Sequence, residues 1–510
     1  MRLGYILDGI SGLSAIASAG ESTEIAGITC DPNLCRPDFL YLAAESETVD
    51  STRYGVRLDG RLYIDAAVQN GATVVLSTPG VTIPRDVRNK FLLLTHAQPL
   101  SILGKICAQF YGERPKQIAL VTGTNGKTST VNFARMLWSG TGRKSCSVGN
   151  LGGVCSDGTV LWDRDPTLSV PETVFMHDML RKLARRGFNH VAMEATSHAL
   201  FDYRLHGLSA SIAAFTNLTR DHLDFHQTME EYFRVKMLLF KEVLPRGSFA
   251  VLNADSPWFE SANEICKDRK HEVLSFGKAG AAIKLMGRAS NKHGQQLDLK
   301  ILGERFESQL NLHGEFQTSN ALCALGIVIA SGVSAKEAVE QLGLLQGVEG
   351  RLNTVAFTPA GGRVIVDYAH TPDGIRAALE ACRSITDGKL FVVFGCNGER
   401  DEGKRGEMGE LAIKLADRVI VTDAHPRTED PERIRRQILD AAEGAREVPN
   451  RVSAIDVAIR ELGPHDTVLI AGLGHEKFRT VGTVRVPYSD TETVLMLLKE
   501  LKRELGREKH

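Results

Sequence analysis

Short apolar runs alternate with helical patterns along most of the chain. In about the first 95 residues, apolar runs at 39–43, 72–76 and 91–94 are separated by turns and by a helical pattern at 66–71. Compact apolar runs bounded by turn residues are typical of buried strands, whereas apolar residues recurring every three or four positions are typical of helices. The pattern predicts a small α/β domain at the N-terminus.

The middle of the chain repeats this alternation on a larger scale. An amphipathic helical pattern at 99–110 leads into an apolar run at 118–121, and further apolar runs stand at 190–193 and 211–215. Repeated strand–helix units favour a mostly parallel sheet. We therefore expect the central part of the protein to be a larger α/β domain.

A more polar stretch of strands and turns at 272–312 precedes a helix of small apolar residues at 321–330. Beyond residue 347 the strand–helix alternation resumes with four apolar runs, at 364–366, 390–394, 418–421 and 467–470. Each run is followed by turn residues and a helical pattern, which is typical of a Rossmann-like domain.

The fold class predicted from these patterns is α/β with three domains. We place a small N-terminal α/β domain at 1–97, a central parallel-sheet domain at 98–346 and a C-terminal Rossmann-like domain at 347–510. A length of 510 residues agrees with roughly three domains of about 150 residues each.

Composition and charge exclude several classes of partner. Lysine and arginine total 61 against 62 acidic residues, so no net charge draws the protein to nucleic acid or to an anionic membrane. Asp8 interrupts the apolar N-terminal region, and no run of 18 apolar residues follows. The nine cysteines form no Cys-x-x-Cys pair and suit reduced thiols. We expect a cytoplasmic protein without a structural metal.

The clearest candidate for chemistry is the sequence LVTGTNGKTST, which lies between an apolar strand and a helix. Gly123 and Gly126 let the backbone turn tightly with its N–H groups inward, Lys127 adds a positive charge, and the next hydroxyl can bind a metal. The loop predicts a site for a nucleoside triphosphate with Mg²⁺. The usual pattern has its first glycine where this chain has Val121, so a plain glycine-rich turn is the alternative.

Four polar clusters follow predicted strands, at the edge where open α/β sheets bind ligands. Glu194 ends one strand and suits a nucleotide-bound Mg²⁺, although a surface glutamate is the alternative. The loop 215–226 contains asparagine, aspartates and two histidines. The segment 367–373 adds aspartates and a histidine, and 395–405 is glycine-rich with three cations that suit carboxylate or phosphate recognition.

Together these motifs resemble the Mur ligase family, over about residues 25–495. The resemblance is strongest to the members that add diaminopimelate or lysine to a UDP-N-acetylmuramoyl dipeptide. The motifs that carry it are GTNGKTST, Glu194 with Ser197 and His198, NLTRDHLDFH, YFRVKMLLF at 232–240, VEGRL at 348–352, DYAHTPD and GCNGERDEGKR.

The resemblance implies a central ATPase domain that shares its nucleotide with the C-terminal domain. The residues implied to bind ATP are Gly123, Thr124, Asn125, Gly126, Lys127, Thr128, Ser129, Arg351, Asp367 and His370. The residues implied to hold Mg²⁺ are Thr128, Glu194, His222 and a carbamylated Lys236. The implied catalytic set is Lys127, Lys236, Lys404 and His222, with Lys404 supporting the transferred γ-phosphoryl group.

The resemblance also implies two substrate sites, and both depart from the family's pattern. Acceptor binding is implied for Ser169, Thr196, Asp202 and Arg204, where the family has a Thr-Thr pair, Ser-Ser-His and a glutamine before the arginine. Amino-acid binding is implied for Arg400, His425, Arg427, Gly472 and Glu476. The family's Asp-Asn-Pro-Arg is Ala424-His425-Pro426-Arg427 here, and its N-terminal Asp-Ser-Arg is Asp31-Pro32-Asn33.

The activity implied is ATP-dependent ligation of an acid to an amino acid through an acyl phosphate. The expected reaction adds meso-diaminopimelate to UDP-N-acetylmuramoyl-L-alanyl-D-glutamate in peptidoglycan precursor synthesis, with a monomer acting on small molecules. One alternative is the same chemistry on another acid and amino acid. A second is a non-catalytic nucleotide-binding relative, which the retained ATP-site residues disfavour. A motor ATPase is disfavoured because no Walker B pattern stands out.

Overall fold

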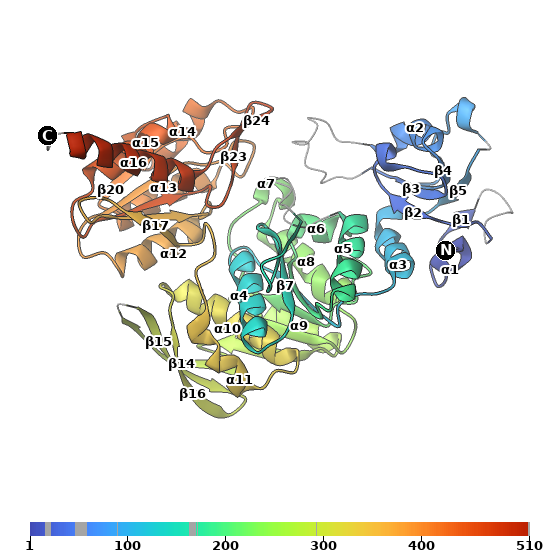
Figure 1. Cartoon of the computed structure of the whole chain (residues 1–510), viewed down its shortest axis with the longest axis horizontal. Helices are drawn as coiled ribbons and strands as arrows, with labels where there is room; N and C mark the ends of the chain where they lie inside the picture. Colours follow the sequence, from blue (N-terminus) through green and yellow to red (C-terminus); the bar gives the residue numbers. More distant parts are fainter. Residues whose placement is uncertain are drawn as a thin grey trace.

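Three α/β bodies follow one another along the chain in the computed structural model, which describes residues 1–15, 22–45, 59–88, 90–162, 170, 172–291 and 293–507. The central body lies between the other two (Figure 1). None of the helices in these residues combines the length and the hydropathy that a bilayer crossing requires.

The N-terminal body is a five-stranded sheet with helices on both faces. Its strand order is β1 (Ser14–Ala15), β5 (Leu92–Thr95), β4 (Ala72–Ser77), β3 (Phe39–Ala43) and β2 (Gly27–Thr29). Successive side chains of a strand point to opposite faces. Leu40 and Leu42 therefore pack with α3 (Pro99–Tyr111), whereas Tyr41 packs with α2 (Ile64–Gln69).

The central body contains a sheet of eleven strands. Their order is β16 (Glu304–Leu310), β15 (Gly294–Ile301), β14 (Ile283–Asn291), β13 (Glu272–Gly277), β12 (Phe249–Asn253), β11 (Ile212–Phe215), β6 (Gln117–Thr122), β10 (His190–Glu194), β7 (Ser145–Gly149), β8 (Gly152–Cys155) and β9 (Val160–Trp162). Because β6 is parallel to both β10 and β11, the carboxyl ends of all three meet at one edge. This edge is where an open α/β sheet binds its ligand.

The C-terminal body has a six-stranded sheet. Its order is β17 (Asn353–Phe357), β18 (Arg363–Asp367), β22 (Thr467–Ala471), β19 (Leu390–Phe394), β20 (Arg418–Val421) and β21 (Arg446–Glu447). All these strands except β17 run parallel, so the ends of β18, β19 and β22 also share an edge. A separate hairpin joins β23 (Phe478–Val481) to β24 (Val484–Pro487).

Helices cover both faces of the two larger sheets. In the central body α4 (Lys127–Gly140) and α10 (Glu315–Ala330) contact each other over one face. The other α-helices are α1 (Leu3–Ile6), α5 (Thr173–Arg185), α6 (Ser197–Phe201), α7 (Leu223–His226), α8 (Met229–Leu238), α9 (Phe259–Asp268), α11 (Ala335–Glu340), α12 (Pro372–Arg383), α13 (Lys404–Leu415), α14 (Pro431–Leu439), α15 (Arg451–Glu461) and α16 (Asp490–Arg507). The short 3-10 and π turns are η1 (Pro32–Leu34), η2 (Gly60–Tyr63), η3 (Arg85–Val87), η4 (Leu239–Val243) and η5 (Leu342–Leu344).

The predicted α/β class is confirmed, with a detail that the apolar pattern missed. The helix expected at 321–330 starts at Glu315, and the apolar pattern missed this start because residues 315–320 are mostly polar. Asn320 lies beside Gly126 of the phosphate loop. The exact boundaries 1–97, 98–346 and 347–510 stay a prediction.

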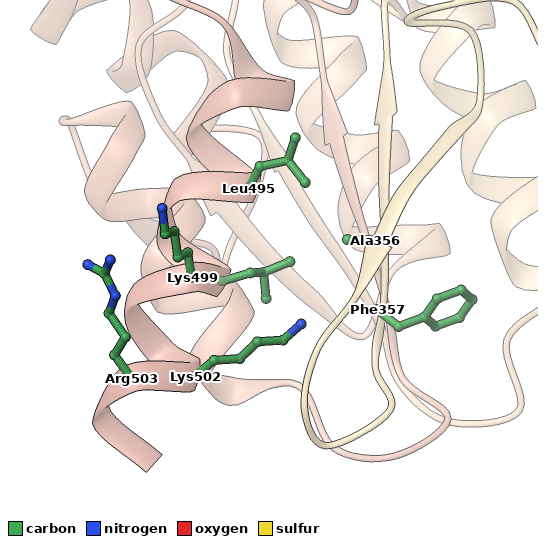
Figure 2. A pocket seen from close by; sticks show the side chains of 7 residues that line it. Ala356, Phe357, Leu495, Lys499, Lys502 and Arg503 are labelled. Atoms are coloured by element: carbon green, nitrogen blue, oxygen red, sulfur yellow. The ribbon is translucent and has the colours of Figure 1, made fainter. Parts of the chain in front are cut away.

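A surface hollow of about 390 Å³ lies between β17 and α16 of the C-terminal body (Figure 2). Its walls combine apolar residues such as Phe357 and Leu495 with the cation of Lys502. None of the residues implied to bind ATP, metal or substrate lines this hollow, so it is not the active site that the motifs predict.

The C-terminal body depends on one fully buried ion pair. Arg451 at the start of α15 donates to Asp490 at the start of α16 through two hydrogen bonds of 2.8 and 2.7 Å, and both side chains are 0% exposed. Tyr488 Oη also donates to Asp490, at 2.9 Å. Removing one partner of such a pair leaves a charge without compensation in a dry environment.

We expect Asp490→Ala to destabilise the C-terminal body by about 3–5 kcal/mol, because Arg451 would remain buried and unpaired. Urea unfolding followed by circular dichroism should show the loss. The three tryptophans all lie between residues 138 and 258, so their fluorescence should change less. Glu461→Ala, which removes an exposed pair with Arg446 at 2.9 Å, is the control and should cost less than about 1 kcal/mol. Equal losses in both variants would contradict the prediction.

Candidate active site

The phosphate loop joins β6 to α4 and needs glycine at two positions. Gly123 has φ 145° and Gly126 has φ 87°, and both angles favour glycine. A Cβ atom on Gly123 would lie 1.9 Å from Thr216 Oγ1, and one on Gly126 would lie 2.2 Å from Asn320 Oδ1. Lys127 Nζ donates to the Gly123 and Thr124 carbonyl oxygens, each at 2.9 Å. The backbone of the loop therefore curves around the Lys127 ammonium group.

Glu194 lies beside this loop at the end of β10, where it is almost completely buried. Its Oε1 accepts hydrogen bonds from Thr128 Oγ1 at 2.9 Å and from the Asn150 backbone N–H at 2.8 Å. A buried carboxylate next to a hydroxyl and a phosphate loop is a set of oxygen donors that suits Mg²⁺, which commonly uses one or two carboxylates plus phosphates.

Lys236 of α8 lies on the other side of the loop and is 1% exposed. Its Nζ donates to Gly123 O at 2.9 Å and lies 4.4 Å from the centre of the Tyr232 ring. Burial, together with the nearby charge of Lys127, holds the pKa of Lys236 well below its ordinary value. The amine can therefore lose its proton, which is the condition for carbamylation.

His222 precedes α7 with φ 53° and lies near the same group of residues. Its ring centre is 4.9 Å from that of His198, and its Nε2 is 3.3 Å from Asp221 Oδ2. Within the described residues, no three His, Cys, Asp or Glu side chains gather as a metal site. A metal at Glu194 and His222 would therefore depend on substrate phosphates and on a carbamate at Lys236.

Asp221 is the site residue that sequence reasoning missed. It is buried between two domains: Lys404 Nζ lies 3.2 Å from its Oδ1, and His370 Nε2 lies 3.7 Å from its Oδ2. Burial by itself would raise its pKa, but His222 and Lys404 hold the pKa well below its usual value. The available signal was its place between two other polar residues in the loop 215–226.

The C-terminal body supplies the residues implied to reach ATP from the far side. Arg351 Nη2 donates to Thr128 Oγ1 at 2.9 Å, and its guanidinium lies 4.4 Å from the centre of the Tyr368 ring. Asp367, at the end of β18, accepts backbone N–H bonds from Leu352 and Ala369, each at 2.6 Å. His370 follows three residues later. Arg351 therefore contacts the phosphate loop directly, whereas His370 lies 3.7 Å from Asp221 of the central body.

The residues implied to bind the amino acid come from loops at the carboxyl edge of the C-terminal sheet. Gly472 follows β22 with φ 110°, and its N–H donates to Asp367 O at 3.1 Å. Glu476 Oε1 is 3.5 Å from Tyr368 Oη. Arg400 Nη1 is 3.9 Å from Asp224 Oδ2 of the central body. Within this set, Glu476 therefore lies beside Tyr368, and Arg400 is close to the central body.

His425 is held in one tautomer. Its Nδ1 accepts a hydrogen bond from the Thr480 backbone N–H at 2.9 Å, so the ring proton is on Nε2. Burial, with Arg427 nearby, lowers its pKa to about 3, so the ring is neutral. Arg427 has φ 55°, and its N–H donates to Thr480 O at 3.2 Å. Both residues are fixed by the β23–β24 hairpin.

Three of the four residues implied to bind the acceptor lie around α6. Thr196 caps this helix, and its Oγ1 accepts from the Ala199 N–H at 3.2 Å. Arg204 Nη2 donates to Asp202 Oδ2 at 2.9 Å, and both side chains are largely buried. Ser169 lies outside the described residues. The pair of Asp202 and Arg204 thus has a local structural role in addition to any contact with substrate.

Comparison with known proteins agrees with this geometry. Residues 121–328 match the Mur ligase middle domain, and residues 350–474 match the Mur ligase glutamate ligase domain. The UDP-N-acetylmuramoyl-L-alanyl-D-glutamate--2,6-diaminopimelate ligase of Rhizobium meliloti (strain 1021) is 40% identical over 479 residues, which are 94% of this chain and 95% of that protein. The protein of the same name from Zymomonas mobilis subsp. mobilis is 40% identical over 440 residues, 86% and 89% of the two chains.

Solved structures give the same result. A structure of a UDP-N-acetylmuramoyl-L-alanyl-D-glutamate--2,6-diaminopimelate ligase superposes with a TM-score of 0.67 at 25% identity, over 98% of this chain and 100% of the other. The MurF ligase of Thermotoga maritima in complex with ADP shares the fold, with a TM-score of 0.64 at 18% identity over 94% and 99% of the two chains.

Three α/β domains whose phosphate loop faces a Rossmann-like domain define an ATP-dependent ligase. The chain belongs to the Mur ligase family. The predictions of family, three-domain fold and ATP-dependent ligase class are thereby confirmed. The roles of individual residues, the Mg²⁺ ions and the lysine carbamate stay predictions.

We expect Gly126→Ala to weaken ATP binding at least about tenfold, because the new methyl group would combine backbone strain with a clash against Asn320. Titration with a fluorescent ATP analogue measures this. Gly142→Ala is the matched control: Gly142 has φ 77° at the other end of α4, but nothing lies within 4 Å of a Cβ there. That variant should bind ATP normally, and equal affinities in both variants would refute the role of the loop.

Proposed function

We propose that this protein uses ATP to add meso-diaminopimelate to UDP-N-acetylmuramoyl-L-alanyl-D-glutamate, a step of peptidoglycan precursor synthesis. We take it to act in the cytoplasm as a monomer on small-molecule substrates. The observation that carries the proposal is the convergence of Lys127, Lys236 and Lys404 at one domain boundary, close to the buried carboxylates of Glu194 and Asp221.

The three domains have separate tasks in this proposal. Residues 1–97 bind the UDP-sugar end of the acceptor, residues 98–346 bind ATP, and residues 347–510 bind the amino acid. The contacts that cross from the third domain to the second, such as Arg351 to Thr128 at 2.9 Å, support a nucleotide shared between them.

The phosphate loop and the third domain hold ATP together. The residues proposed to bind ATP are Gly123, Thr124, Asn125, Gly126, Lys127, Thr128, Ser129, Arg351, Asp367 and His370. Thr128, Glu194, His222 and carbamylated Lys236 would hold Mg²⁺, which when bound neutralises phosphate charge. Burial of Glu194 and the lowered pKa of Lys236 support this set.

Activation of the acid is the chemical task, because a carboxylate does not react with an amine at neutral pH. The acceptor carboxylate attacks the γ-phosphorus of ATP, which forms an acyl phosphate and releases ADP. The amino group of the amino acid then attacks the acyl carbon, and inorganic phosphate leaves as the amide forms. Lys127 and Lys404 supply positive charge along the phosphoryl path.

Recognition of the acceptor is assigned to Thr196, Asp202 and Arg204 in the region around α6, and to Ser169 from the sequence. The amino acid is assigned to Arg400, His425, Arg427, Gly472 and Glu476. Arginine pairs a carboxylate with two parallel hydrogen bonds, so Arg400 and Arg427 favour an amino acid with a second carboxylate at its far end. Glu476 suits the distal ammonium group. These assignments favour meso-diaminopimelate over lysine.

A ligase that joins a different acid and amino acid by the same chemistry is the second candidate. The observation that favours it is His425, whose Nδ1 is occupied by Thr480 and which replaces the family's asparagine. An imidazole with a single free N–H can only donate one hydrogen bond to a substrate, whereas an amide side chain can both donate and accept hydrogen bonds. Release of ADP measured over a matrix of acids and amino acids, including a UDP-N-acetylmuramoyl dipeptide, distinguishes the two candidates.

We expect Lys236→Ala to be nearly inactive and to be partly rescued by a short carboxylate such as acetate or propionate. Such a carboxylate can fill the space of the side chain and supply the oxygen ligands of the lost carbamate. ADP release in the presence and absence of the additive is the measurement. Lys241→Ala, at an exposed position one turn further along, is the control and should keep full activity. An inactive variant that no carboxylate restores would count against the carbamate.

We also expect Arg427→Ala to lower kcat/KM for diaminopimelate at least tenfold while the affinity for ATP changes little. Loss of one partner of a buried charge pair typically costs about 2–5 kcal/mol. Steady-state kinetics with diaminopimelate and with lysine decides this. Lysine used as well as diaminopimelate by the unmodified enzyme would refute the arginine clamp, and no turnover with either would favour the second candidate.

A further inference from the structure

We propose that the ion pair between Arg220 and Asp401 is a latch that holds the central and C-terminal domains closed and keeps Lys404 in register with Asp221. Arg220 and Asp401 are then positioning residues that act through Lys404. This inference rests on the proposed function only in giving Lys404 a task during phosphoryl transfer. The closure of the two domains is a separate, measurable property.

The pair has the geometry of a specific contact. Arg220 Nε donates to Asp401 Oδ2 at 2.8 Å, and Nη2 donates to Oδ1 at 3.0 Å. The carboxylate is only 6% exposed, although the arginine is 41% exposed. Bidentate pairs of this kind are both stronger and more directional than a single ionic contact. The pair therefore fixes orientation as well as distance between the two domains.

The loops that carry the latch also carry residues of the site. Arg220 immediately precedes Asp221 in the loop between β11 and α7, and Asp401 lies three residues before Lys404 in the loop between β19 and α13. Lys404 Nζ lies 3.2 Å from Asp221 Oδ1, with both side chains nearly buried. The partly exposed pair of Arg220 and Asp401 thus lies beside the buried pair of Asp221 and Lys404, and both pairs join the same two loops.

Packing ties the latch to the first turn of α13. The Gly403 N–H donates to Asp401 Oδ1 at 3.0 Å, so the carboxylate that holds Arg220 also holds the start of the helix. A Cβ atom on Gly403 would lie 2.1 Å from Arg220 Nη2. The guanidinium therefore lies over the backbone of the residue that precedes Lys404. A shift of Arg220 would be passed directly to Lys404.

Other contacts between the central and C-terminal domains constrain the relative position of the two domains less. Arg400 Nη1 is 3.9 Å from Asp224, and Asn125 Nδ2 is 3.4 Å from Thr371 Oγ1, so both are long. Arg351 to Thr128 is short at 2.9 Å, but Arg351 follows the domain junction closely and moves little when the domains rotate. The latch is the short, bidentate contact on the side where Lys404 lies.

The test compares Arg220→Gln, Asp401→Asn and the double variant with the unmodified full-length protein. Each single change should lower kcat for ADP release by about five- to tenfold, with the KM for ATP within about twofold. The double variant should be no slower than the slower single variant, because both changes break the same pair. Arg220→Lys keeps the charge but not the second hydrogen bond and should recover part of kcat.

Small-angle X-ray scattering measures closure without any ligation. The unmodified protein with a non-hydrolysable ATP analogue should have a smaller radius of gyration than Arg220→Gln or Asp401→Asn under the same conditions. Arg383→Gln is the matched control, because Arg383 is also 41% exposed and pairs with Asp417 inside the C-terminal domain. It should match the unmodified protein in both measurements.

The outcomes separate the latch from the proposed function. Scattering and kcat that are unchanged in both single variants would overturn the latch, as would a double variant whose losses multiply. An unmodified enzyme that releases no ADP with any pair of acid and amino acid would overturn the proposed function instead. In that case the scattering comparison alone still decides whether Arg220 and Asp401 hold the domains closed.

Discussion

A carboxylate buried between two domains is the constraint on which this site depends. A buried charge without partners is costly, and Asp221 is tolerated only because Lys404 and His370 of the C-terminal domain and His222 of its own loop surround it. Two of these three partners come from the other domain. In this arrangement of the domains the charge of Asp221 therefore has partners from both sides, and the same closeness brings Arg351 to the phosphate loop.

Sheet topology explains why so many polar groups meet there. In the central domain β6 lies between β10 and β11, so the phosphate loop, Glu194 and the loop that carries Asp221 leave the sheet at one edge. In the C-terminal domain β22 lies between β18 and β19, so Asp367, Gly472 and the loop of Lys404 do the same. Each sheet thus presents its loops at its carboxyl edge, and the two edges face each other.

Two buried lysines of the site, Lys236 and Lys404, differ in their partners. Lys236 has no carboxylate among its hydrogen-bond partners, and burial drives it toward the neutral amine. Lys404 instead lies 3.2 Å from a carboxylate oxygen of Asp221. One lysine is suited to covalent modification and the other to binding phosphate charge. His425 is also buried, and its neutral ring, fixed by one backbone hydrogen bond, would offer a single N–H to the pocket proposed for the amino acid.

The sequence by itself determined the α/β class, the strands at its clearest apolar runs and the local identity of the loops, but it did not predict β7, β8, β9 or β12. These features are local: apolar runs set strands, and Gly123 and Gly126 are required by backbone angles within the loop itself. The start of α10 at Glu315 was missed because residues 315–320 are mostly polar. Only the tertiary structure decided that Arg220 meets Asp401, that Asp221 is the centre of the boundary and that His425 is a neutral donor. Arg220 and Asp401 are 181 positions apart in the sequence, and Asp221 and Lys404 are 183 positions apart. No local pattern encodes which of many polar side chains will be buried together.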